Sequence, residues 1–155
     1  MAGRIDARLS ELGLTIPDAP VPAANYVPFV IAKNMVYVAG QLPFVDGKVA
    51  KTGKVGQDLD TPAAKEIARI CAINIVAQVK TACGGDLDRV VRCVEVGGFV
   101  NCIDGYAEQP EVLNGASDLM VEVFGDAGRH ARFAVGTNAL PRNVPVEVKA
   151  VFEIS

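Results

Sequence analysis

The sequence predicts an α+β fold in which two helices cover one face of a mostly antiparallel sheet. Two long segments carry apolar residues at helical spacing, and several shorter apolar segments have the length of strands. The last of these alternates between apolar and polar side chains, which is typical of a sheet with one covered face. The chain has the length of one ordinary domain, so we expect a single domain over residues 1–155.

The N-terminal segment predicts a helical extension at about residues 3–19. Three apolar residues recur at helical spacing after Arg4, namely Ile5, Leu9 and Leu12. Three prolines follow and predict an extended linker, namely Pro17, Pro20 and Pro22. Strands are then expected over 29–32 and 35–40, joined by Lys33 and Asn34. A second hairpin is expected around Asp46 and Gly47, a pair that favours the positive φ of a tight turn.

Two helices are expected in the middle of the chain. The first begins with Thr61 as its N-cap and Pro62 in its first turn, and it ends at Gly84–Gly85. Its apolar positions recur near helical spacing at Ala68, Ala72, Ile75, Val79 and Ala82. A strand follows over about 90–101. The second helix begins after Pro110, reaches Val123 and is stopped by Gly125.

Two final strands, 131–137 and 144–154, are expected to form a hairpin across the loop at 138–143. With Thr137 opposite Val144, Arg132 and Glu147 become diagonal neighbours on the face away from the helices. A covered arginine needs a partner because an unpaired buried charge is costly. That partner is either Glu147, in a structural ion pair, or a small carboxylate ligand held by the guanidinium fork. The residues alone leave both interpretations open.

The sheet has a second apolar face that the two helices do not cover. The segments 35–40 and 90–101 are largely apolar at both odd and even positions. Association with identical subunits is the economical way to cover this face. The alternative is that the N-terminal helix folds over it.

Composition argues against several classes of protein. A formal net charge of −3 lacks the basic excess of a dedicated nucleic-acid binder. No apolar segment is long enough for a membrane span and the first residues do not resemble a signal peptide, so we expect a cytoplasmic protein. The four cysteines lack metal-site spacing and are expected to be buried apolar residues, namely Cys71, Cys83, Cys93 and Cys102. The single histidine, His130, is expected in an exposed loop, with a functional role left open.

Three segments resemble the YjgF/RidA (Rid) family of enamine/imine deaminases, and the resemblance extends over nearly the full chain. They are 34–44, 73–85 and 131–154, of which the last, ARFAVGTNALPRNVPVEVKAVFEI, looks like the family signature. The resemblance implies a chorismate-mutase-like subunit, a homotrimer with a central β-barrel, and sites in the clefts between subunits. It also implies hydrolysis of reactive 2-imino and enamine acids to 2-keto acids and ammonia, with no metal or organic cofactor.

Five residues take site roles by this resemblance. Arg132 matches the arginine that holds the substrate carboxylate, and Glu147 matches the glutamate that positions the attacking water. Tyr26, Gly40 and Asn114 match further substrate-binding positions. Each of these three also has a structural interpretation, as edge packing, turn chemistry and a solvated helix residue, respectively.

Three positions depart from the family pattern and indicate a divergent branch. Phe133 and Ala134 stand where members often carry Ser and Cys, and Ala39 stands where Ser is frequent. The loss of hydroxyl and thiol groups makes the expected site drier. This favours, as an alternative, a non-catalytic protein that binds small carboxylic acids. An endoribonuclease or translation inhibitor is a further alternative, against which the net charge and the single histidine argue.

Overall fold

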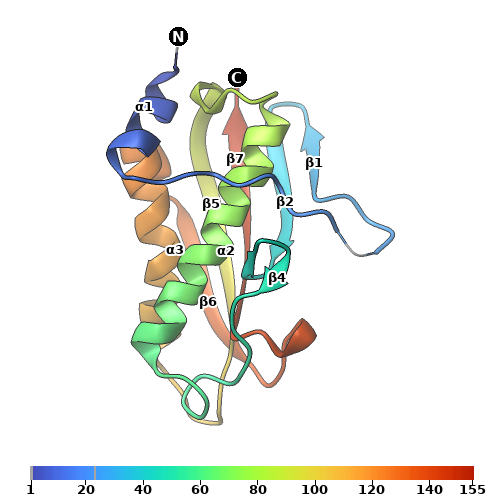
Figure 1. The fold of residues 1–155 in the computed structure, drawn as a ribbon, viewed down its shortest axis with the longest axis vertical. Coiled ribbons are helices and arrows are strands. Elements are labelled where there is room, and N and C mark those ends of the chain that lie inside the picture. Colours follow the sequence, from blue (N-terminus) through green and yellow to red (C-terminus); the bar gives the residue numbers. More distant parts are fainter. Residues whose placement is uncertain (1, 23) are drawn as a thin grey trace.

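A sheet with two long helices on one face forms the centre of the molecule (Figure 1). The computed structural model describes residues 2–22 and 24–155. The helices and strands of this part follow one another in the order α1 (Arg4–Glu11), β1 (Phe29–Ala32), β2 (Met35–Gln41), β3 (Phe44–Val45), β4 (Lys48–Val49), α2 (Thr61–Ala82), η1 (Leu87–Arg89), β5 (Val90–Asn101), α3 (Gln109–Phe124), η2 (Gly125–Gly128), β6 (Ala131–Thr137), η3 (Pro141–Asn143) and β7 (Val146–Ile154), where η marks a 3₁₀ turn.

The main sheet has the strand order β1-β2-β7-β5-β6 in the described part of the chain. All neighbouring strands run antiparallel except β5 and β6, which are parallel, so the prediction of a mostly antiparallel sheet is confirmed. The predicted hairpin of the last two strands is wrong, because β5 lies between β6 and β7. The connection at 138–145 crosses one end of β5, a gap of roughly 10 Å that eight residues span easily.

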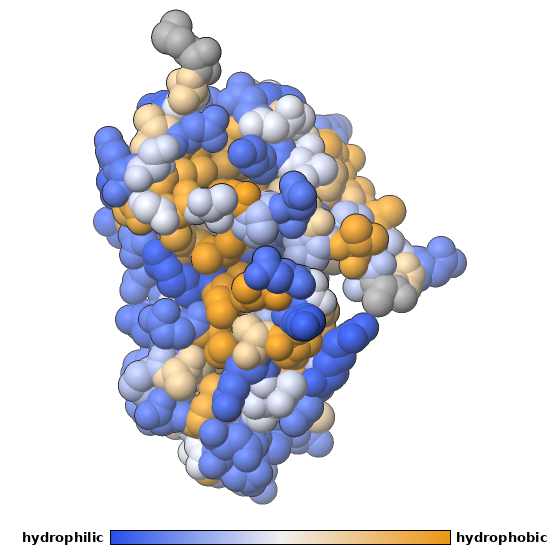
Figure 2. All heavy atoms as spheres, viewed as in Figure 1, coloured by the Kyte–Doolittle hydropathy of each residue, from blue (hydrophilic) through white to orange (hydrophobic). Residues whose placement is uncertain are grey.

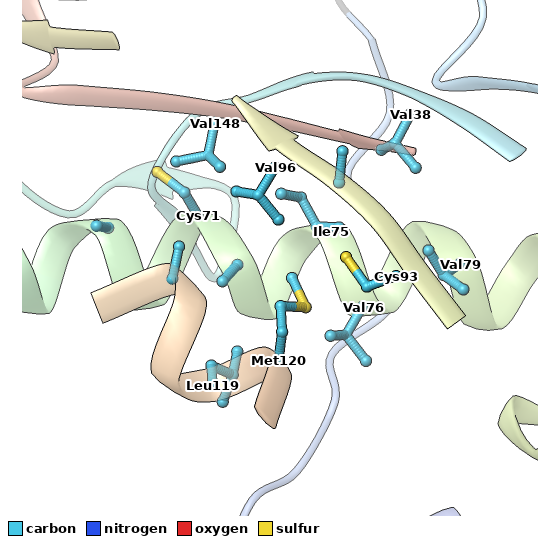
Figure 3. Packing of buried hydrophobic residues seen from close by; sticks show 14 of the residues in the cluster. Val38, Cys71, Ile75, Val76, Val79, Cys93, Val96, Leu119, Met120 and Val148 are labelled. Atoms are coloured by element: carbon cyan, nitrogen blue, oxygen red, sulfur yellow. The ribbon is translucent and has the colours of Figure 1, made fainter. Parts of the chain in front are cut away.

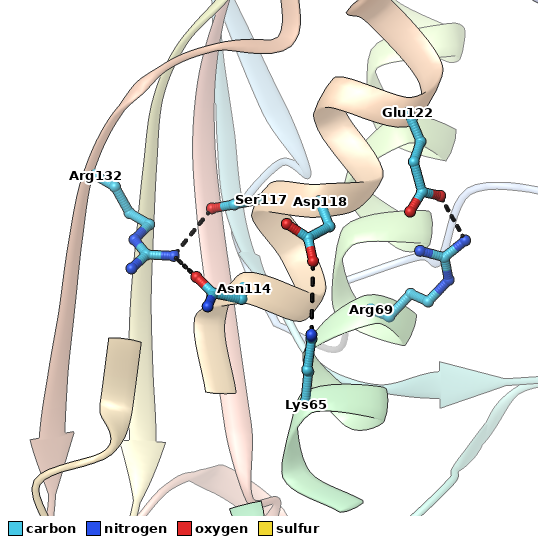
Figure 4. A network of polar contacts seen from close by, with 7 residues as sticks. All are labelled: Lys65, Arg69, Asn114, Ser117, Asp118, Glu122 and Arg132. Carbon is cyan, nitrogen blue, oxygen red and sulfur yellow. Dashed lines mark hydrogen bonds and ion pairs between the residues drawn. The ribbon is translucent and has the colours of Figure 1, made fainter. Parts of the chain in front are cut away.

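The face covered by α2 and α3, here called the helix face, holds the core (Figure 3). Val148 and Val96 of the sheet pack with Ile75 of α2 and Met120 of α3, all of them fully buried. The two helices approach closely at Gly115, where an added Cβ would overlap the backbone carbonyl of Lys65. Ion pairs also join them at their outer surface (Figure 4).

The N-cap of α2 differs from the expected residue. Asp60, not Thr61, caps the helix, because its carboxylate accepts a hydrogen bond of 3.0 Å from the Ala63 amide. The Thr61 hydroxyl lies 2.6 Å from the Tyr106 hydroxyl instead. Pro62 lies in the first turn as predicted.

The first helix packs beside α3 and does not cover the opposite face of the sheet, so that alternative is wrong (Figure 1). Asp88 holds its first turn, because its two carboxylate oxygens accept 2.8 Å hydrogen bonds from the amides of Arg4 and Ile5. The chain then runs across α2 as a strap, residues 12–22, and Gln78 of α2 donates a 2.7 Å hydrogen bond to the Pro20 carbonyl.

The opposite face of the sheet, here called the open face, is left uncovered by the described residues and carries apolar side chains beside the charged Glu95, Lys149 and Glu147. Tyr37 and Val135 are 48% and 44% exposed, respectively. Phe99 of β5 and Phe133 of the edge strand β6 form an edge-to-face pair with ring centres 5.6 Å apart. Apolar side chains at these positions leave a face that the subunit itself cannot cover.

Candidate functional site

Arg132 and Glu147 lie on different faces of the sheet. Arg132 pairs with Val96 of β5, which in turn pairs with Ala150 of β7, and these residues share the helix face. Glu147 pairs with Phe99 and therefore belongs to the open face. Three residues along a strand and two strand spacings separate the two Cα atoms by roughly 14 Å. The predicted diagonal pair is therefore wrong, because it depended on a hairpin that does not form.

Arg132 projects from the edge strand β6 toward α3 (Figure 4). Its Nη1 donates to Asn114 Oδ1 at 2.9 Å and to Ser117 Oγ at 3.2 Å. Both hydrogens of Nη1 are thereby used. Among residues 2–22 and 24–155, Nε and Nη2 have no hydrogen-bond partner, and no carboxylate pairs with the guanidinium. The free Nε–Nη2 edge presents two parallel donors, which is the geometry that binds a carboxylate through both oxygens.

Ser117 and His130 extend this polar group. Sequence reasoning missed Ser117, and it expected His130 in an exposed loop with its functional role left open. His130 Nε2 lies 2.8 Å from Ser117 Oγ, and His130 Nδ1 lies 2.6 Å from the Gly128 carbonyl oxygen. The ring is half-buried between η2 and β6, so the expectation of an exposed loop residue is wrong. Thirteen positions separate Ser117 from His130 along the chain, and no local pattern indicates that they meet.

Glu147 lines a groove together with two other predicted site residues, Tyr26 and Gly40. The groove has a volume of about 960 Å³ and is here called the Glu147 groove. An irregularity in the pairing of β2 between Val38 and Gln41 brings Gly40 against the carboxylate. A Cβ added at Gly40 would lie 2.6 Å from Glu147 Oε1, so only glycine leaves this carboxylate undisturbed.

The Glu147 carboxylate is half-buried, and burial raises its pKa. In the described part of the chain it has neither a hydrogen-bond donor nor a cationic partner to offset that cost. A carboxylate whose pKa is raised in this way is a stronger base than a solvated one. Burial, together with the charge of Glu147, raises the pKa of the Cys71 thiol, which donates to the Val146 carbonyl.

Arg142 is a cation of the Glu147 groove that sequence reasoning also missed. It lies in η3 with φ 56°, and its guanidinium stacks 5.8 Å from the centre of the Phe44 ring. The only sequence signal was its place in the loop of the signature-like segment. The groove reaches the side of the molecule where apolar side chains gather over α2, among them Ile70 and Ile73 (Figure 2).

The departures from the family pattern lie on both sides of the sheet. Phe133 faces the open face, where a Cβ at Gly97 would overlap its ring. It therefore points away from Arg132, which lies on the helix face. Ala134 is half-buried against the core, and the Ala39 amide donates to the Pro28 carbonyl at 2.9 Å.

The four cysteines offer neither a nucleophile nor a metal site in the described part of the chain. All four cysteines are buried, as predicted, and burial raises the pKa of Cys93 to about 12. Within residues 2–22 and 24–155, no three His, Cys, Asp or Glu side chains come together as metal ligands would. In the same part of the chain, none of the helices has the length and apolar character that crossing a bilayer requires.

Comparison with known proteins gives consistent matches along the chain. The family model described as "YjgF/chorismate mutase-like, putative endoribonuclease" matches residues 6–153. Protein TCP17 of Trypanosoma cruzi is 44% identical over 155 residues, which cover 99% of this chain and 96% of that protein.

Two solved structures are similar over almost their whole length. Atu1372 of Agrobacterium tumefaciens, a protein of unknown function, has 50% identity and a TM-score of 0.91, with 97% of this chain and 92% of that chain covered. A "putative endoribonuclease" of Shewanella oneidensis has 32% identity and a TM-score of 0.93, with 98% and 100% covered, respectively. Both matches span the strands and helices that carry the two groups of polar residues.

Proposed function

The chain belongs to the YjgF/RidA (Rid) family, and from this premise we propose that it hydrolyses reactive 2-imino and enamine acids to 2-keto acids and ammonia. The proposed site is shared by two subunits, with Arg132 contributed by one subunit and Glu147 by the other. The proposal also assigns Tyr26 and Gly40 to the Glu147 side of the site and Asn114 to the Arg132 side.

The observation that carries the proposal is the state of the Arg132 guanidinium. Two neutral acceptors hold Nη1, while Nε and Nη2 stay available. A planar carboxylate fits this edge with two charge-assisted hydrogen bonds, each worth roughly 1.5–3 kcal/mol. Because the head group is already held in place, little side-chain entropy remains to be lost on binding.

Glu147 supplies the acid–base chemistry of the proposed reaction. Its carboxylate orients a water whose oxygen adds to the C=N carbon, while the water's proton passes to Glu147 and the nitrogen takes one from solvent. Glu147 then returns its proton to the nitrogen. As the C–N bond breaks and ammonia departs, the hydroxyl on the same carbon loses its proton to solvent and becomes the carbonyl of the 2-keto acid. An imine carbon is already electrophilic, so positioning and modest acid–base assistance suffice.

A second copy of the chain is needed because one subunit keeps the two groups apart. The uncovered open face and the edge strand β6 support association, and we propose the homotrimer with a central β-barrel that the family resemblance implies. In that assembly, Glu147 of the partner subunit approaches the free edge of Arg132.

Ammonia release from an imino acid tests the proposal. An amino-acid oxidase generates the imino acid in situ, and the rate of its hydrolysis is compared with and without the protein. We expect Arg132→Ala to lose about 100-fold in this acceleration, as the loss of roughly 3 kcal/mol of carboxylate binding implies. Arg8→Ala is the control, because this exposed arginine of α1 forms an ion pair with Glu11 and belongs to neither group of site residues; we expect a much smaller effect there.

Non-catalytic binding of a small carboxylic acid is the second candidate, since the Arg132 group alone suffices for it. Calorimetric binding of a 2-keto acid without any acceleration of imine hydrolysis would establish this reading. Cleavage of RNA by wild-type protein but not by Arg132→Ala would instead favour the nuclease activity that the family description names.

A further inference from the structure

The structure determines which atom donates in each hydrogen bond among Ser117, His130 and Gly128, behind Arg132. The Gly128 carbonyl oxygen can only accept, so His130 Nδ1 must donate across their 2.6 Å contact. In the neutral ring Nε2 then has no hydrogen and can only accept. The Ser117 hydroxyl, 2.8 Å away, must therefore donate its single hydrogen to Nε2.

This donation leaves the lone pairs of Ser117 free for Arg132. Nη1 donates one hydrogen to Ser117 Oγ at 3.2 Å and the other to Asn114 Oδ1 at 2.9 Å. Donors thus run one way along the chain of groups, from Arg132 through Ser117 and His130 to Gly128. Hydrogen bonds aligned in this manner polarise and strengthen one another.

The far end of this chain of groups is rigid. Gly128 is buried, and an added Cβ there would overlap the Met120 carbonyl, so η2 packs directly on α3. Ser117 and Asn114 lie on α3 itself, on the side that faces β6 (Figure 4). The Arg132 head group is therefore positioned by α3 and η2, although its backbone belongs to an exposed edge strand.

We propose that Ser117 and His130 form a relay that positions the Arg132 guanidinium for a carboxylate ligand, with His130 as a positioning residue at its end. The proposal deepens the proposed function, because it rests on Arg132 as the carboxylate site. Without the relay, the guanidinium of an exposed edge residue samples many rotamers and loses the fixed Nε–Nη2 edge.

The ring of His130 gives a direct test, since it is the only histidine of the chain and has a single set of ring signals. The full-length protein is labelled with ¹⁵N-histidine, and long-range ¹H–¹⁵N correlations are recorded at pH 8. We expect the proton on Nδ1 and none on Nε2 in wild type. The opposite tautomer would overturn the relay, whether or not the protein is an enzyme.

A ligand titration separates the relay from the proposed function. We add 2-ketobutyrate, follow its binding by calorimetry, and record the same ring signals. We expect the Nε2 signal to move on binding to wild type, and to stay unchanged in Ser117→Ala at saturation. Unchanged signals in saturated wild type would overturn the relay. Absence of binding would count against Arg132 as a carboxylate site, while the tautomer still decides the relay.

Kinetics of two His130 variants provide the final control. His130→Gln places an amide oxygen near the Nε2 position and keeps an acceptor for Ser117, whereas His130→Phe keeps the ring shape without one. We expect KM to rise about tenfold in His130→Phe with little change in kcat, and the Gln variant to recover most of the loss. Thermal denaturation curves establish that both proteins are folded. Equal KM values in wild type and His130→Phe would then contradict the proposal.

Discussion

Arg132 and Glu147 point to opposite faces of one sheet, and strand β5 separates the strands that carry them. A small imino acid cannot bridge roughly 14 Å and a sheet layer, so one subunit cannot place both groups on one ligand. The proposed chemistry therefore depends on association, and the two half-sites become testable separately.

Mixing two inactive variants tests the shared site. Arg132→Ala and Glu147→Gln each leave one half-site intact, so a site formed by an intact Arg132 and a neighbour's intact Glu147 appears only in mixed assemblies. Random assembly of equal amounts restores about one quarter of such sites. Imine hydrolysis measured after co-refolding should recover to roughly that fraction of wild type, while each variant refolded alone should stay inactive. No recovery from verified mixed assemblies would contradict a shared site.

Charges on the open face should prevent association. Tyr37 and Val135 expose 48% and 44% of their surface, and a lysine at either position places a charge where the proposed interface needs apolar contact. We expect Tyr37→Lys and Val135→Lys to sediment as monomers in analytical ultracentrifugation and to lose activity.

A matched control for the charged variants lies on β1. Ile31 is 46% exposed but pairs with Val36 and so belongs to the helix face. Ile31→Lys should keep the oligomeric state of wild type. Identical sedimentation of wild type, Val135→Lys and Tyr37→Lys would show that the open face is not the interface.

Local sequence pattern predicted the elements closely, and the order of the strands poorly. The bounds of β5 agree with the predicted 90–101, and β7 begins two residues later than expected. Periodicity and turn residues are local, so they report where an element lies. They carry no information on which strand inserts between β6 and β7, and the assumption of a hairpin between consecutive strands failed there.

The difference between local pattern and long-range packing also explains which residues of the candidate site could be predicted. Gly40 and Glu147 were predicted by resemblance, and the structure brings them together through the irregular pairing of β2. The relay from Ser117 to His130 depends on how η2 packs against α3, which no short segment encodes. Long-range polar contacts of this kind become visible only once the packing of the elements is known.

Gly40→Ala should reduce activity with little effect on stability. The three atoms nearest to the added Cβ all belong to the Glu147 side chain, with Oε1 at 2.6 Å, and that flexible side chain can move away. We expect a change in unfolding free energy below about 1 kcal/mol, because no buried backbone is disturbed. Displacement of the carboxylate should lower kcat about tenfold or more. Wild-type kcat in Gly40→Ala would indicate that the position of this carboxylate does not matter for the reaction.

The half-buried carboxylate of Glu147 should make stability depend on pH. Burial raises its pKa above the ordinary value of 4.5, so the folded protein keeps this proton to a higher pH than the unfolded chain does. Stability therefore falls as pH rises from the unfolded pKa to the folded one, and it changes no further above that. Glutamine at this position cannot ionise, so its stability does not fall with rising pH for this reason. In the monomeric Val135→Lys background, which lacks the partner subunit's Arg132, we expect Glu147→Gln to unfold at a higher temperature than the same protein with Glu147 at pH 8, and the difference to shrink toward pH 4. Equal unfolding temperatures of these two proteins at pH 8 would contradict the effect of burial.

Glu95→Gln serves as the control for this pH dependence. Glu95 lies on the same face and forms a half-exposed ion pair with Lys149 at 3.7 Å, so its replacement should lower stability slightly at pH 8. A wild-type protein more stable than Glu147→Gln at pH 8 would mean that the carboxylate has a cationic partner in the assembled protein. Comparison with the monomeric Val135→Lys background then identifies its source: a partner supplied by another subunit is lost there, and the stabilising effect of Glu147→Gln should return.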